Sequence, residues 1–234
     1  MAECEKSGSG GSIAKSFDQY EYVAVLTPGA TLLFGLMLIW PDRNQLLTNH
    51  EVGLGALGIF LLAAYVVGHI LRALGDILEA CLWRLFGGMP TDWVLVSGQE
   101  LLDAADQTEL QRRIQILSSS ANTLNDYAGK RKEWKLVIRR MNAAVFRGGG
   151  GARVDAFNRT YGLMIGVTVA LLVLGVVQLF GLFWYGGTKH QMLYCALTFA
   201  SALLTLIRAY CFGVHYGREL FAQFLQLPET TLTA

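Results

Sequence analysis

The sequence predicts an all-α polytopic membrane protein, with four transmembrane helices and a helical cytoplasmic insert between the second and the third. Four apolar stretches contain no Asp, Glu, Lys or Arg, namely residues 22–40, 52–71, 161–185 and 192–207. A helix needs about 20 apolar residues to cross the hydrocarbon core. Four such segments would need far more polar chain to cover them in water. Between the second and the third lies a polar insert of 89 residues, 72–160.

The first two spans come with distinct local signals. Residues 1–21 form a tail whose Ser/Gly run at 7–12 is typical of a flexible segment. Pro28 and Gly29 interrupt the first span, because proline lacks an N–H and clashes with the preceding turn. The second span is expected to continue past residue 71 as a helix that ends at the Gly-Gly-Met-Pro sequence 87–90. Its predicted stripe is Leu71, Leu74, Leu78, Leu82 and Leu85.

The rest of the insert is also expected to be helical. Helices are predicted over residues 99–117 and 123–146, and a loop or hinge over 148–151. A last helix is predicted to begin near Asp155 and to run into the third span. Apolar side chains recur at helical spacing over 123–146, and their predicted inner face is Trp134, Val137, Ile138, Met141 and Val145.

The basic residues predict the orientation. Seventeen of the 19 Lys and Arg residues fall in the insert or in the two ends of the chain, and only Arg43 and Lys189 fall in the loops on the other side. The positive-inside rule therefore places both termini and the insert in the cytoplasm. The predicted domains are an N-terminal tail (1–21), spans one and two (22–71), a cytoplasmic helical domain (72–160), spans three and four (161–212) and a C-terminal tail (213–234).

The insert divides into two halves of opposite charge. Residues 72–126 carry four basic and eight acidic residues, whereas 127–160 carry nine basic and two acidic residues. Three interpretations of the basic half stay open: pairing with the acidic half, binding to anionic lipid headgroups, or binding of a phosphate-bearing ligand. The residues that would bind a signal, a lipid or a partner are Lys130, Arg131, Lys132, Lys135, Arg139 and Arg140.

Glycines in the spans predict close helix packing. The GLGALG sequence at 53–58 matches the letters of a dinucleotide fingerprint, but no strand precedes it and it opens a membrane span. Small residues at such spacing let helix backbones approach each other within one chain or between copies. The predicted packing glycines are Gly53, Gly58, Gly162, Gly166, Gly213 and Gly217.

The candidates for a pore or gate are Pro28, Gly29, His69 and Arg208. The proline break needs hydrogen-bonding partners or must line a cavity in the membrane, and the two ionisable groups lie near the inner ends of spans two and four. No catalytic set, metal cluster or cofactor motif stands out. Arg208 and His215 fit the loose arginine–histidine spacing of HEPN ribonucleases, which leaves a membrane-tethered nuclease as a minor hypothesis.

Two stretches, FDQYEYVAVLTPG (17–29) and GHILRALGDILEACLWRLFGGMPT (68–91), resemble small multi-span inner-membrane effectors of bacterial anti-phage defence systems. The resemblance implies a bacterial inner-membrane protein that permeabilises the membrane under control of a cytosolic sensor protein or a nucleotide or oligonucleotide signal. An insert of this size buries only a marginal core, which favours a homo-oligomer. We therefore expect an oligomeric channel or pore-forming effector gated through its cytoplasmic domain. The alternative is a non-conducting membrane anchor or scaffold that recruits a cytosolic partner.

Overall fold

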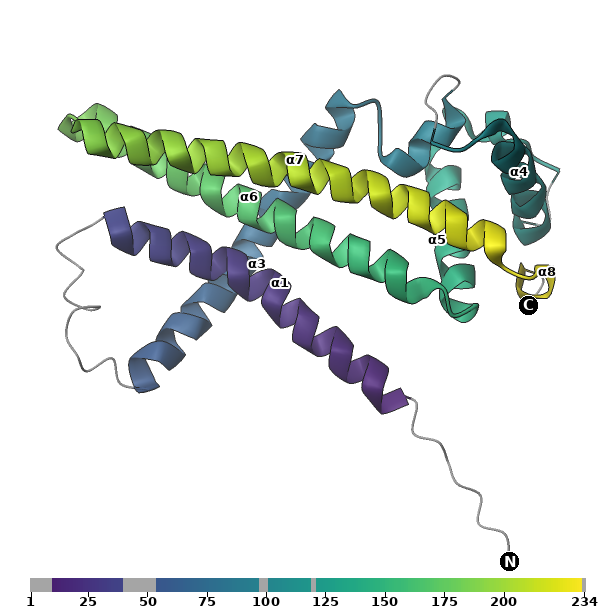
Figure 1. Cartoon of the computed structure of the whole chain (residues 1–234), viewed down its shortest axis with the longest axis horizontal. Helices are drawn as coiled ribbons and strands as arrows, with labels where there is room; N and C mark the ends of the chain where they lie inside the picture. Colours follow the sequence, from purple (N-terminus) through teal and green to yellow (C-terminus); the bar gives the residue numbers. More distant parts are fainter. Residues whose placement is uncertain (1–9, 40–53, 97–100, 119–120, 233–234) are drawn as a thin grey trace, which may run out of the picture. The chain divides into compact units, whose positions relative to one another are not determined.

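The structure is a computed structural model that describes residues 10–39, 54–96, 101–118 and 121–232. These residues form helices and turns and contain no strand, so the all-α prediction is confirmed for them (Figure 1). The helices are α1 (Gly10–Ile39), α3 (Leu54–Leu85), η2 (Pro90–Leu95), α4 (Ala104–Ser118), η3 (Leu124–Tyr127), α5 (Arg131–Arg147), α6 (Gly151–Tyr185), α7 (Lys189–Gln226) and α8 (Glu229–Leu232).

Three helices, α3, α6 and α7, are long and apolar enough to cross a membrane. They contain 32, 35 and 38 residues. The apolar described part of α1, Val23–Ile39, is shorter than these candidate spans. The structure therefore supports three membrane-spanning candidates by length and composition, and the first span stays a prediction.

Two helix boundaries agree with glycine chemistry. Helix α3 continues past the apolar segment to Leu85, as predicted, and ends where Gly87 and Gly88 take φ values of 79° and 125°. The predicted helix over 123–146 is instead divided into η3 and α5. Gly129, with φ of 85°, lies between them and takes a left-handed conformation that interrupts a helix.

Other boundaries differ from the predictions. Helix α1 begins at Gly10, inside the Ser/Gly run that was expected to be flexible. No proline precedes Pro28, and a helix that has formed gains one hydrogen bond for each residue added to it. Helix α4 begins at Ala104 rather than at residue 99, and α6 begins at Gly151 rather than near Asp155.

The predicted leucine stripe of α3 is wrong for two of its members. Leu74 and Leu85 are 40% and 83% exposed, whereas Leu71 and Leu82 are buried. The buried line instead combines small residues, Ala64, Gly68 and Gly75, with the two buried leucines, Leu71 and Leu82. Close helix contacts favour small side chains, so the contact line of α3 is displaced from the line of largest side chains.

The chain folds as two compact units. The first contains Met1–Leu78 and Gly162–Leu206, and the second contains Glu79–Tyr161 and Ile207–Ala234. The boundaries fall inside α3, α6 and α7, so each of these helices contributes to both units. The C-terminal residues, predicted as a tail, fold together with the insert.

The core of the first unit is built by α1, α3 and α6. Its buried residues are Leu32, Leu71, Val169, Ala170 and Leu174. In the second unit an aromatic cluster surrounds Trp83, whose Nε1 donates a 2.8 Å hydrogen bond to the Tyr161 hydroxyl. The ring of Trp83 also packs against those of Trp93 and Tyr210. This aromatic cluster joins the end of α3, η2, the start of α6 and α7.

Candidate functional site

Pro28 and Gly29 do not interrupt α1, contrary to the prediction, because the helix continues from Gly10 to Ile39. Both residues lie at a helix crossing. A Cβ on Gly29 would come within 1.8 Å of the Ala64 carbonyl oxygen, and a Cβ on Gly68 within 2.1 Å of the Val25 carbonyl oxygen. Helices α1 and α3 therefore touch backbone to backbone at this point. The Pro28 ring is fully buried. Its Cγ lies 2.7 Å from where a Cβ of Gly166 on α6 would stand.

Four of the six predicted packing glycines contact another segment of the same chain. Besides Gly166, a Cβ on Gly162 would meet the Arg72 guanidinium at 2.8 Å, one on Gly213 the Trp83 ring at 2.5 Å, and one on Gly217 the Pro90 ring at 3.1 Å. Gly58 has nothing within 4 Å of its Cβ position in the described chain. Gly53 lies outside the described residues.

The ionisable gate candidates lie on different helices and contact aromatic rings. His69 on α3 meets the Tyr65 ring edge-on, with a centroid distance of 4.6 Å. Arg208 on α7 lies over the Phe212 ring at 4.7 Å. His215 packs against Phe157 of α6, with a centroid distance of 5.8 Å. The arginine and the histidine of the nuclease hypothesis thus each have an aromatic neighbour.

A line of polar side chains along α7 was missed in the sequence. Thr198, Ser201, Thr205 and Arg208 follow one another at spacings of three and four residues, so they share one face of the helix. Ser201 and Arg208 are exposed and the two threonines are half-buried. Thr205 Oγ1 is hydrogen-bonded to Thr168 Oγ1 of α6 at 2.9 Å. The three- and four-residue spacing of these polar side chains was the signal available in the sequence. Most of the line lies in the predicted fourth span, which was recognised by its lack of charged residues alone.

A second polar group lies in the apolar part of α6. The side-chain oxygen Oε1 of Gln178 is buried, and within the described chain it has no hydrogen-bond partner. Lipid tails offer no donor to such an oxygen, and an unsatisfied amide in hydrocarbon is costly.

Helix α5 carries four of the six predicted basic residues, Lys132, Lys135, Arg139 and Arg140, on its outer face. Its inner face, as predicted, buries Trp134, Val137, Met141 and Val145, while Ile138 is half-buried. Two of the basic residues are paired, since Arg131 lies 3.3 Å from Asp92 and Lys130 lies 3.8 Å from Glu133. Lys132, Lys135, Arg139 and Arg140 are exposed and form no ion pair with a described carboxylate.

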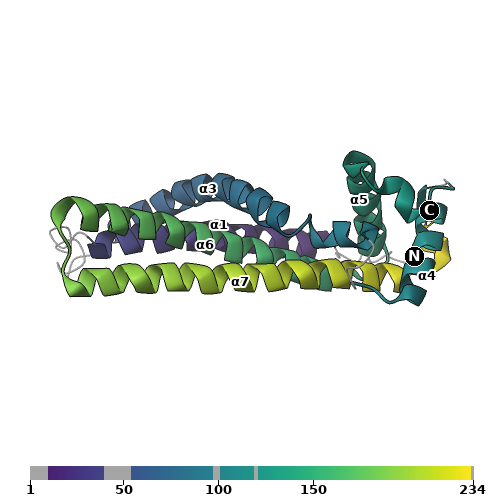
Figure 2. The ribbon, with the colours of Figure 1, turned by 90° about the horizontal axis from the view of Figure 1, so that it is seen from above.

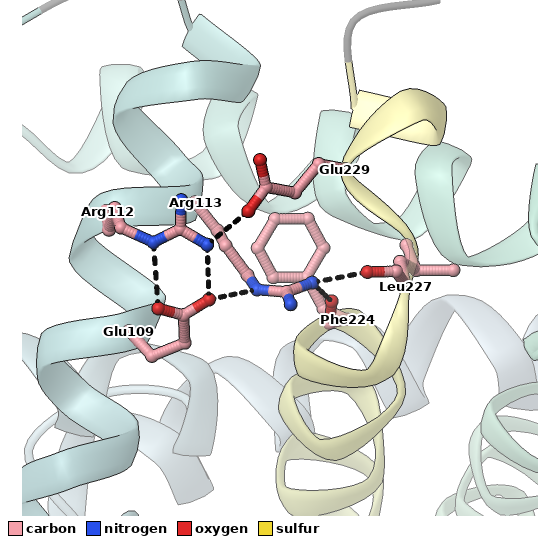
Figure 3. A network of polar contacts seen from close by, with 6 residues as sticks. All are labelled: Glu109, Arg112, Arg113, Phe224, Leu227 and Glu229. Atoms are coloured by element: carbon pink, nitrogen blue, oxygen red, sulfur yellow. Dashed lines mark hydrogen bonds and ion pairs between the residues drawn. The ribbon is translucent and has the colours of Figure 1, made fainter.

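A polar network anchors the end of α7 to α4 (Figure 3). Arg113 Nη1 donates hydrogen bonds to the carbonyl oxygens of Leu227 at 2.6 Å and Phe224 at 3.2 Å. Its Nε donates to Glu109 at 2.6 Å. The C-terminal carbonyls of a helix lack intrahelical partners and carry partial negative charge, so this guanidinium acts as a cap for α7.

The electrostatics of the network follow from two arginines around one carboxylate. Hydrogen bonds from Arg112 and Arg113 lower the pKa of the Glu109 carboxyl to about 2, from an ordinary value of 4.5. The pKa of the Arg112 guanidinium is raised, mainly by its hydrogen bonds to Glu109 and secondly by its 2.7 Å hydrogen bond to Glu229. Glu109 and Arg112 therefore stay charged over the physiological pH range. No sequence signal linked α4 to the start of α8, because these elements lie 117 positions apart.

Comparison with protein-family models, with curated protein sequences and with solved structures finds no match for the chain. Within the described residues, no three His, Cys, Asp or Glu side chains gather as a metal-binding group. Three features of the described chain bear on function: the polar line of α7, the basic face of α5 and the network at the end of α7.

Proposed function

We propose that the protein is a homo-oligomeric membrane channel, in which α7 lines the path and the second unit controls it. In this proposal α1, α3, α6 and α7 cross a bacterial inner membrane. The insert and both termini lie in the cytoplasm, as the distribution of basic residues indicates. The observation that carries the proposal is the polar line Thr198, Ser201, Thr205 and Arg208 on an otherwise apolar helix.

Polar side chains along a membrane helix need hydrogen-bonding partners. Thr198 and Thr205 find them within α7, because their hydroxyls donate to the carbonyl oxygens of Tyr194 and Ser201, so Ser201 and Arg208 are the residues that support a hydrated path. Neighbouring side chains of α7, such as Leu203, Leu204 and Ile207, are more than half exposed and suit lipid. An exposed arginine near the helix end and an exposed serine in mid-segment suit water or another helix, because polar groups within the membrane face cavities or bundle interiors. Copies of the chain arranged with α7 inward would put this line around a hydrated path.

Control from the second unit is supported by the continuity of α7 and by its cap. Helix α7 is one helix of 38 residues, about 57 Å long at 1.5 Å per residue. Its last turn is held to α4 by Arg113 through two carbonyl oxygens. A signal that moves α4 would therefore act directly on the helix proposed to line the path. The resemblance to anti-phage effectors implies that the signal is a cytosolic sensor or a nucleotide.

Cysteine substitution in reconstituted protein tests the proposal. In a chain whose four native cysteines are replaced, Ser201→Cys would lie on the path and Leu203→Cys, two residues along the same helix, would face lipid. Ion flux from liposomes should fall when a charged, water-soluble thiol reagent is added to the Ser201→Cys protein, and should not change for the Leu203→Cys protein. Equal responses of the two variants, or the absence of flux from liposomes under all conditions, would contradict the proposal.

A non-conducting scaffold is the second candidate, and the exposed basic face of α5 favours it. A scaffold predicts no flux and the stable capture of a soluble partner by the full chain in detergent. Reversal of the charges at Lys132, Lys135 and Arg139 should abolish that capture. The nuclease hypothesis predicts RNA cleavage that is lost in His215→Ala, and a cleavage assay on the purified chain tests it.

A further inference from the structure

We propose that the outer face of α5 docks on the anionic lipid headgroups of the membrane that the chain spans. This inference depends on the proposed cytoplasmic position of the second unit, but it does not depend on conduction.

The outer face is a continuous strip along the whole of α5. Helical spacing puts eight residues on it, all exposed: Lys132, Lys135, Leu136, Arg139, Arg140, Ala143, Phe146 and Arg147. Five are cations and none is an acid. Helix α5 has 17 residues, so the strip is about 25 Å long. Such a density of positive charge on one side of a helix attracts an extended anionic surface.

The charge of the strip is not neutralised within the chain. None of its five cations forms an ion pair with a described carboxylate. Four exposed acids of the described chain already have partners: Asp76, Glu133 and Glu229 form ion pairs and Asp126 accepts hydrogen bonds from Thr123. Asp103 and Asp106 are the remaining acids that the described chain records as exposed. Two carboxylates are too few to balance five cations, so the described part of a neighbouring copy is a poor electrostatic match for the strip.

Two large apolar side chains in the strip favour lipid over nucleic acid. Leu136 is 50% exposed and Phe146 is 49% exposed, and both lie among the cations. Leucine and phenylalanine next to lysine and arginine are typical of helices that lie in the membrane interface, where apolar side chains enter the acyl boundary and cations meet phosphates. A soluble polyphosphate would neutralise the cations but would leave both apolar side chains in water.

The packing of α5 gives the strip a direction. The inner face of α5 contacts α4 and α8. Both lie at the end of α7, because α8 begins three residues after Gln226 and Arg113 of α4 caps the last turn of α7. Figures 1 and 2 show α4 beyond α5 in the direction in which the last part of α7, residues 207–226, runs. The strip therefore lies on the side of α5 that faces away from α4 and α8.

A fluorescent label in the middle of the strip tests the docking. The full chain without its native cysteines is labelled with an environment-sensitive dye at Ala143→Cys, and the matched control carries it at Ala105→Cys, an exposed alanine of α4. Both proteins are reconstituted in phosphatidylcholine liposomes with and without phosphatidylglycerol. With the anionic lipid, the dye at residue 143 should be quenched by spin-labelled lipid and protected from iodide in solution, while the dye at 105 should not respond.

Charge variants separate docking from a folding defect. The protection should be removed by the combined substitutions Lys132→Glu, Lys135→Glu and Arg139→Glu. Each basic residue removed should lower the ratio of docked to free α5 roughly fivefold. Lys132→Arg, Lys135→Arg and Arg139→Lys together should keep it. Higher salt should weaken it, because exposed charges are screened.

Two results would overturn the proposal. One is equal iodide quenching at residue 143 in both lipid mixtures. The other is protection that arises only when a short RNA or polyphosphate is added, which would assign the strip to a soluble anion. Ion flux measured in the same liposomes keeps the proposals distinct, since docking without flux would refute the channel alone.

Discussion

Substitution of Gly68 by alanine should destabilise the first unit, because α1 and α3 touch there through their backbones. A Cβ on Gly68 would lie 2.1 Å from the Val25 carbonyl oxygen, and real Cβ contacts essentially never fall below 3.0 Å. The helices must therefore move apart by roughly 0.9 Å, and the oxygen that blocks the methyl group belongs to the backbone. Overpacking of this kind costs about 1–3 kcal/mol.

Gly58 provides the matched control on the same helix. It is exposed and has nothing within 4 Å of its Cβ position. Alanine there should be neutral or should stabilise the helix by about 0.5–1 kcal/mol, because glycine has the lower helix propensity. The two variants should thus differ by at least about 1 kcal/mol in unfolding free energy.

The assay is equilibrium unfolding of the purified chain in detergent micelles, followed by tryptophan fluorescence. Gly29→Ala should behave like Gly68→Ala, because its Cβ would lie 1.8 Å from the Ala64 carbonyl oxygen. The double variant should cost less than the sum of the two, since one separation of the helices relieves both clashes. Equal stability of Gly68→Ala and Gly58→Ala would refute the backbone crossing.

Three further predictions concern the second unit. Arg113→Ala should destabilise the protein by about 1.5–3 kcal/mol in thermal unfolding, because it leaves two carbonyl oxygens without a charged donor. Arg112→Ala should destabilise it less, because the Arg112 side chain is half exposed. The wild-type protein should melt at a higher temperature than Glu109→Gln, by a constant amount above pH 4.5 and by a vanishing amount as the pH falls toward 2. The reason is that a lowered folded-state pKa stabilises the fold only where the carboxyl is ionised. A difference in melting temperature that persists at pH 2 would contradict this. Trp83→Phe should lower the unfolding free energy by about 1–3 kcal/mol, because it removes a buried 2.8 Å hydrogen bond to Tyr161. Tyr161→Phe should cost less in the Trp83→Phe protein than in the wild type, and strict additivity of the two effects would argue against the bond.

The sequence identified the helical elements better than their contacts. The inner face of α5 was predictable, because Trp134, Val137, Met141 and Val145 recur at helical spacing on a helix that packs on one side only. The contact line of α3 was not, because Gly68 is buried by the approach of α1, and nothing in the local sequence distinguishes it from exposed Gly58. The division of the residues over 123–146 was signalled by Gly129, which takes φ of 85°.

The sequence by itself determined an all-α chain with apolar segments of membrane length and a strong asymmetry of basic charge, because these properties depend on local composition and spacing. Only the tertiary structure decided which surfaces are free and which are joined. It brought Arg113 to the end of α7, left the outer face of α5 without acidic partners and placed the polar line of α7 on a partly exposed face. Such features depend on how elements far apart in the chain pack, so one-dimensional patterns cannot fix them.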